Sequence, residues 1–155
     1  MAKMTHSEVA AKLIVEGILG TIAGTVKGKL GIEPMVLTER EATSMGIPTG
    51  SGAPMFYPVD GKTGVFLDVL WSRTAIWYEA PDAGRAAGAV EALLKKNYPD
   101  AKLANDTPDP DDPLMHLRVY DVKLPDSKMA TVEMRTSTVA PPRFSAQIIA
   151  MGIKN

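Results

Sequence analysis

Residues 114–139 read LMHLRVYDVKLPDSKMATVEMRTSTV, and they are the clearest indication of the fold class. It contains two predicted strands, Leu114 to Leu124 and Lys128 to Val139, with only the tripeptide PDS between them. Proline, aspartate and serine are typical turn residues, and parallel strands need a much longer crossover than three residues. The stretch therefore predicts two antiparallel strands joined by a tight turn, and so an antiparallel sheet.

The segments on either side add further strands and a helix to this pair. Four more strands are predicted: Met55 to Val59, Val65 to Trp71, Thr74 to Ala80 and Phe144 to Ile153. A helix is expected to begin at Pro81-Asp82 and to run to about Asn97, because small and apolar residues repeat there with helical spacing. The acidic, proline-rich segment from Leu103 to Pro113 is expected to be a loop.

The N-terminal part of the chain is expected to contribute two helices. Thr5 and Glu8 have the spacing of a capping box, and the apolar residues that follow predict a helix over about residues 7–30. A second capping box, Thr38 with Glu41, predicts a short helix from Glu39 to Met45. One side of the first helix carries glycines at spacings of three and four: Gly17, Gly20, Gly24, Gly28 and Gly31. Each interior glycine costs about 1 kcal/mol relative to alanine, so the alternative is a helix that stops near Gly20.

Together these elements predict a single α+β domain over residues 1–155, with a strand-rich body from about residue 54 to 153. The predicted antiparallel β-sheet has about five or six strands. One helix crosses a face of this sheet, and the N-terminal Gly-rich helix packs nearby.

The composition excludes several classes of protein. The 17 lysines and arginines balance 18 acidic residues, and a net charge of −1 gives no general attraction to nucleic acid. The chain has no cysteine, which excludes disulfides and cysteine nucleophiles and fits a cytoplasmic protein. The apolar run from Leu13 to Val26 is interrupted by Glu16 and is shorter than the roughly 20 residues that a membrane span needs. We therefore expect no nucleic-acid partner and no integral membrane span.

The sequence also indicates no metal site and no cofactor. The only two histidines, His6 and His116, lie far apart in the chain. The aspartates of NDTPDPDD, residues 105–112, lack the spacing, the glycine and the terminal glutamate of an EF-hand. A solvated acidic loop is the favoured interpretation of this segment, and a calcium site is the less favoured one.

One candidate binding surface follows from the alternation of strand residues. Six side chains would share one face of the sheet if the faces of three strands coincide: Asp68, His116, Arg118, Tyr120, Glu133 and Arg135. Asp68 lies among aliphatic residues, where a carboxylate is usually paired or has a shifted pKa. The first interpretation is a solvated sheet face with cross-strand ion pairs. The second is a site for a small polar or anionic ligand, with Arg118 and Arg135 as its clamps.

The leading functional hypothesis is a non-enzymatic binding or interaction protein that forms a homo-oligomer. The glycine side of the first helix (Gly17, Gly20, Gly24 and Gly28) would let a second helix approach closely, although the same glycines would also pack against the chain's own sheet. The alternative is a small-ligand-binding protein or a small enzyme that uses Asp68, His116 and Arg118 on the polar face. A third hypothesis is peripheral membrane association through the first helix, which would be weak because few basic residues flank its apolar side.

Overall fold

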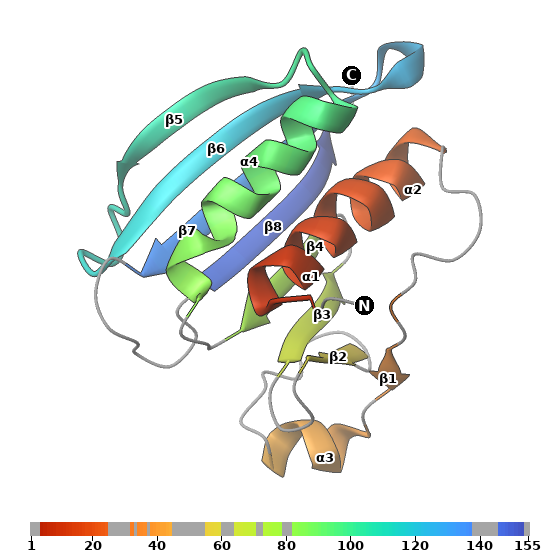
Figure 1. The fold of residues 1–155 in the computed structure, drawn as a ribbon, viewed down its shortest axis with the longest axis vertical. Helices are drawn as coiled ribbons and strands as arrows, with labels where there is room; N and C mark the ends of the chain where they lie inside the picture. Colours follow the sequence, from red (N-terminus) through yellow and green to blue (C-terminus); the bar gives the residue numbers. More distant parts are fainter. Residues whose placement is uncertain are drawn as a thin grey trace.

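The computed structural model describes residues 4–24, 32, 34–36, 38–44, 55–59, 64–70, 73–78, 82–137 and 146–153. These residues form one antiparallel sheet, and the long helical segments pack on one of its faces (Figure 1). The strand order is β1-β2-β3-β4-β8-β7-β6-β5, and each pair of neighbours is antiparallel. The predicted α+β fold class is confirmed.

The described strands include all six that the sequence predicts, with ends that differ by a few residues. Their bounds are β2 Met55–Pro58, β3 Gly64–Leu70, β4 Arg73–Tyr78, β6 Met115–Lys123, β7 Met129–Ser137 and β8 Ala146–Ile153. The turn between β6 and β7 contains Asp126 and Ser127, both with positive φ, and Leu124 N–H donates to Lys128 O at 2.8 Å to close it.

Two strands at the edges of the sheet were not predicted, and the prediction of a loop from Leu103 to Pro113 is partly wrong. Residues Lys102–Pro108 form β5, which pairs with β6. Residues Met35–Val36 form the short strand β1, which pairs with β2. Nearly every residue of β5 is exposed, so the strand is held by backbone pairing and shows no apolar alternation in the sequence.

The N-terminal helical segment runs without a break from His6 to Ala23, as α1 (His6–Lys12), the π-helical η1 (Leu13–Ile18) and α2 (Leu19–Ala23). The predicted capping box is present, since Glu8 N–H donates to Thr5 Oγ1 at 3.2 Å and Thr5 N–H donates to Glu8 Oε1 at 3.1 Å. The helix passes Gly20 but ends at Gly24, before the predicted end near residue 30. Gly24 has φ +73°, a left-handed conformation that ends a helix and that glycine adopts easily.

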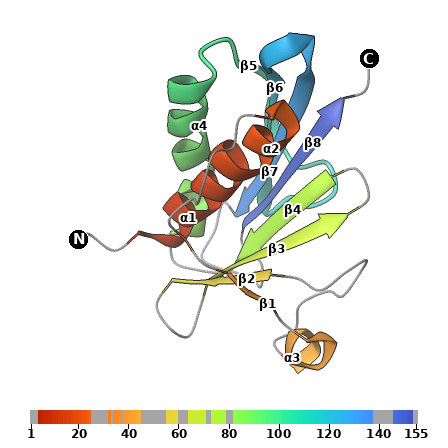
Figure 2. The ribbon, with the colours of Figure 1, turned by 90° about the vertical axis from the view of Figure 1, so that its right-hand side faces the viewer.

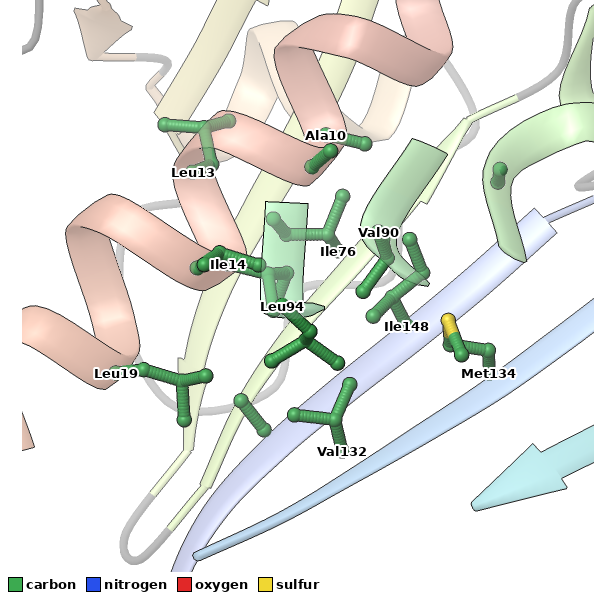
Figure 3. Packing of buried hydrophobic residues seen from close by; sticks show 14 of the residues in the cluster. Ala10, Leu13, Ile14, Leu19, Ile76, Val90, Leu94, Val132, Met134 and Ile148 are labelled. Atoms are coloured by element: carbon green, nitrogen blue, oxygen red, sulfur yellow. The ribbon is translucent and has the colours of Figure 1, made fainter. Parts of the chain in front are cut away.

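The second long helix is α4 (Ala86–Asn97), which follows the 3₁₀ turn η2 (Ala83–Arg85), as predicted from the helical spacing. It lies beside α1 on the same face of the sheet, and both views show the helices on one side (Figures 1 and 2). The core fills the space between helices and sheet (Figure 3). Its fully buried members include Ile14 and Leu19 from the N-terminal segment, Leu94 from α4 and Ile148 from β8.

The short helix α3 (Glu39–Ser44) lies apart from this helix layer, near β1 and β2 (Figure 2). Its predicted capping box is also present: Glu41 N–H donates to Thr38 Oγ1 at 3.1 Å and Thr38 N–H donates to Glu41 Oε1 at 3.3 Å. Met45, the predicted last residue, lies outside the described residues.

Candidate functional site

The register of β6 and β7 divides the predicted polar face between the two sides of the sheet. Arg118 lies opposite Met134, and Val119 lies opposite Glu133. Because directly opposed residues of antiparallel strands point to the same face, Arg118 shares a face with Met134, which is fully buried in the core beneath the helices.

The six predicted site residues are therefore not one surface. His116, Arg118 and Tyr120 lie on the helix-covered face, whereas Glu133 and Arg135 lie on the opposite face. The alternation of side chains within each strand was predicted correctly. The sequence does not show the register between β6 and β7, however, and a shift of one residue in that register moves a side chain to the other face of the sheet. Asp68 lies in β3 opposite Ala75, and its side chain is outside the described part of the chain.

Around Arg118, six residues of α4, β5 and β6 form what we term the polar edge cluster: Glu91, Lys95, Asp106, His116, Arg118 and Tyr120. Arg118 holds Glu91 with two donors, Nη1 to Oε2 at 2.7 Å and Nη2 to Oε1 at 3.4 Å. Asp106 Oδ1 pairs with His116 Nε2 and lies 3.8 Å from Arg118 Nε. Lys95 Nζ lies 3.8 Å from Glu91 Oε1. The guanidinium that the second interpretation assigned as an anion clamp is thus bound by a carboxylate of the same chain.

A bulge in β5 brings Asp106 to this cluster. The register of β5 and β6 shifts between Leu103 and Asn105, so that one extra residue is inserted in β5 and Asp106 lies opposite Arg118. Without the extra residue, Asp106 would lie opposite Leu117 and point to the other face of the sheet. Bulges commonly redirect a side chain in this way.

Contacts within the cluster shift the pKa values of two of its members. The hydrogen bond from His116 lowers the pKa of Asp106, and the positive charge of Arg118 lowers it further. Burial raises the pKa of Tyr120 to about 12, with a further increase from its hydrogen bond to Glu91 and from the Glu91 charge. At neutral pH the Tyr120 hydroxyl is uncharged and donates a hydrogen bond to Glu91, and the Asp106 carboxylate is ionised.

Arg135, on the opposite face, fastens the loop that follows β5. Its Nε donates to Asp109 Oδ2 at 3.0 Å, and its Nη1 lies 3.3 Å from Glu133 Oε2. The side chain of Asp109 is only 3% exposed, and its Oδ1 accepts the N–H of Asp111 at 2.9 Å. This aspartate is therefore buried and paired, in contrast to the expected solvated loop. Within the described residues, no group of three or more His, Asp or Glu could hold a metal ion.

A buried cluster at the start of α1 was not predicted. Ser7 Oγ donates to Asp82 O at 2.8 Å and lies 2.8 Å from Tyr78 Oη, and Ser7 N–H donates to Asp82 Oδ2 at 2.9 Å. His6 stacks on the Tyr78 ring, with centroids 5.9 Å apart. Burial raises the pKa of Tyr78 well above its usual value. No local spacing in the sequence reveals a partner 75 residues away.

The glycines predicted for self-association have different environments. Gly17 and Gly20 are buried within the chain, whereas Gly24 is exposed beyond the end of α2. Gly28 lies outside the described residues. Burial of Gly17 and Gly20 accords with the alternative that they pack inside the chain, although Gly20 also lines a surface hollow.

That hollow is one of two that follow the outer side of the helix layer, and we term the pair the helix groove. Its first part, of about 300 Å³, lies between α1 and α4, and its second part, of about 320 Å³, lies between η1–α2 and the end of α4. Both are mostly apolar, and Glu16 lines both. The lining residues are Met4, Glu8, Ala11, Lys12, Glu16, Ala89, Ala92 and Leu93 in the first part, and Val15, Glu16, Gly20, Asn97, Tyr98 and Pro125 in the second.

Among the described residues, no helix has the length and hydropathy to cross a bilayer. The chain was compared with models of protein families, with curated proteins and with solved structures, and none of the three comparisons finds a match.

Proposed function

We propose that the protein is a non-enzymatic binding protein that self-associates through the helix groove. Support comes from the outer surface of the helix layer, which is hollowed between two helices and lined mostly by small and apolar residues. The charged side chains of the polar edge cluster instead bind one another, so Arg118 is engaged by Glu91.

The observation that carries this proposal is Gly88, which precedes the groove residue Ala89 and lies one turn before the groove residue Ala92. It lies inside α4, it is exposed, and a Cβ at this position would meet no atom within 4 Å. A glycine inside a helix costs about 1 kcal/mol relative to alanine, and no contact of Gly88 within the described chain requires its small size. Gly84 and Ala92, four residues away on either side, are exposed as well. Close approach of a second backbone would explain small residues at all three positions.

Sedimentation velocity tests the proposal, over concentrations from about 1 µM to about 200 µM, a range that includes weak dimers. We expect the average mass to rise with concentration. The variant Ala92→Arg places a long charged side chain in the groove and should remain monomeric. Ala104→Arg, at an exposed alanine on the edge strand β5, is the matched control and should behave as the unmodified chain. A monomer at every concentration, or equal association of the two variants, would refute the proposal.

The Asp106–His116 pair favours a second candidate function, binding or conversion of a small ligand at the polar edge cluster. A carboxylate that orients an imidazole is a common arrangement for a general base. Native mass spectrometry of freshly purified protein would reveal a bound small molecule as added mass. Loss of that mass in Asp106→Asn, with an unchanged melting temperature, would support this candidate over the first.

A further inference from the structure

We infer that two copies of the chain pair about a two-fold axis that runs along the helix groove, so that α1 of one copy lies over α4 of the other. This inference rests on the proposed function, because it specifies the partner and the geometry of the same surface. It follows from the exposed charges on the two sides of the groove. On the side of α1 and η1 the groove is lined by Glu8 and Glu16 with Lys12 between them. On the other side the hollows themselves are lined by uncharged residues, and the exposed charges nearby are Lys95 and Lys96 of α4 and Arg85 of η2, all positive.

The two helices run side by side in the same direction (Figure 1). Glu8 and Lys12 line the first hollow together with Ala89 and Ala92, and Glu16 lines the second together with Asn97. Glu16 is thus level with the last turn of α4. A two-fold axis parallel to the groove places α1 of one copy over α4 of the second copy, and each residue keeps its height along the groove. Glu16 of one copy therefore faces Lys96 of the second copy.

The other symmetric arrangement is electrostatically unfavourable. A two-fold axis across the groove would lay α1 antiparallel on α1 and α4 antiparallel on α4. Glu8 would then face Glu16 of the second copy, and Lys12, midway between them, would face Lys12 of the second copy. Like charges placed opposite each other in an interface are costly, so the charge pattern selects the axis along the groove.

The area of the helix layer indicates the size class of the interface. The 12 residues of α4 span about 18 Å, and two helices side by side are about 20 Å wide. Such a patch buries on the order of 1,000 Å² in total over both copies, which is near the lower limit for a specific interface. We therefore expect a weak dimer, so the concentration series must extend well above about 1 µM.

Charge reversal tests the axis separately from the interface. Glu16→Lys and Lys96→Glu should each raise the dissociation constant about tenfold, because each places like charges in contact. The combination of both reversals recreates opposite charges and should restore the dissociation constant to within about threefold of the unmodified chain. Glu16 also pairs with Lys12 at 3.3 Å, so the melting temperature of each variant is measured to show that the fold is intact.

The outcomes separate the two proposals. A chain that is monomeric at every concentration refutes both the proposed function and the axis. A dimer that Ala92→Arg disrupts, but in which the double reversal is as weak as either single reversal, overturns the axis and retains the groove as the interface. Restoration by the double reversal supports both.

Discussion

Replacing Ser7 by alanine should cost a large share of the stability of this domain. The Ser7 hydroxyl makes two hydrogen bonds of 2.8 Å, one with Tyr78 Oη and one to Asp82 O, and both Ser7 and Tyr78 are buried. Each lost hydrogen bond costs about 1 kcal/mol, and a buried partner that is left unsatisfied raises the cost to about 1–3 kcal/mol. We therefore expect Ser7→Ala to lower the unfolding free energy by about 2–4 kcal/mol, out of about 5–15 kcal/mol for a typical domain.

The assay is urea denaturation followed by circular dichroism, with two comparison variants. Tyr78→Phe removes only one of the two bonds, so it should cost about half as much, and the double variant should cost little more than Ser7→Ala alone because the shared bond is lost once. Ser44→Ala is the control, because the Ser44 hydroxyl donates to Glu41 O on the exposed surface of α3. A change of less than about 0.5 kcal/mol in Ser7→Ala, as for a typical surface substitution, would refute the role of this cluster.

Two further predictions concern pH and the exposed glycine. Because the pKa of Tyr120 is raised to about 12 in the folded chain and is near 10 when unfolded, its contribution to stability is complete below pH ~10 and is lost as the pH rises toward 12. Denaturation midpoints measured across this interval should fall less steeply in Tyr120→Phe than in the unmodified chain, and equal slopes would contradict the assignment. Gly88→Ala should raise the unfolding free energy of the dilute monomer by about 0.5–1 kcal/mol, because alanine loses less backbone freedom than glycine on folding and the added Cβ meets no other atom. The same variant should weaken self-association in sedimentation velocity, and an unchanged association would remove Gly88 from the interface.

The parts of the fold that were predictable from the sequence depend on contacts between near neighbours. Both capping boxes join residues three positions apart, as at Thr5 and Glu8, so their hydrogen bonds follow from local spacing alone. The strands of the β6–β7 hairpin were predictable for the same reason. In contrast, β5 has no buried apolar side, and only its pairing with β6 makes it a strand.

The candidate site depends on long-range contacts, which the sequence does not show. Arg118 meets Glu91 across 27 residues, and Ser7 meets Asp82 across 75. The bulge that turns Asp106 toward Arg118 has no signal in a polar edge strand, and without it the side-chain alternation would place Asp106 on the wrong face. The sequence therefore shows which side chains carry a charge, but it does not show which of them form ion pairs in the folded chain.

The bulge in β5 also limits how this chain can aggregate. An edge strand presents unpaired N–H and C=O groups that can recruit further strands and build open-ended fibres. Here β5 is interrupted by its bulge and ends at Pro108, which has no N–H to donate, and the other edge, β1, is only two residues long. Growth of the sheet from copy to copy is therefore blocked at both of its described edges. Both described edges are thus protected against open-ended pairing with strands of other chains.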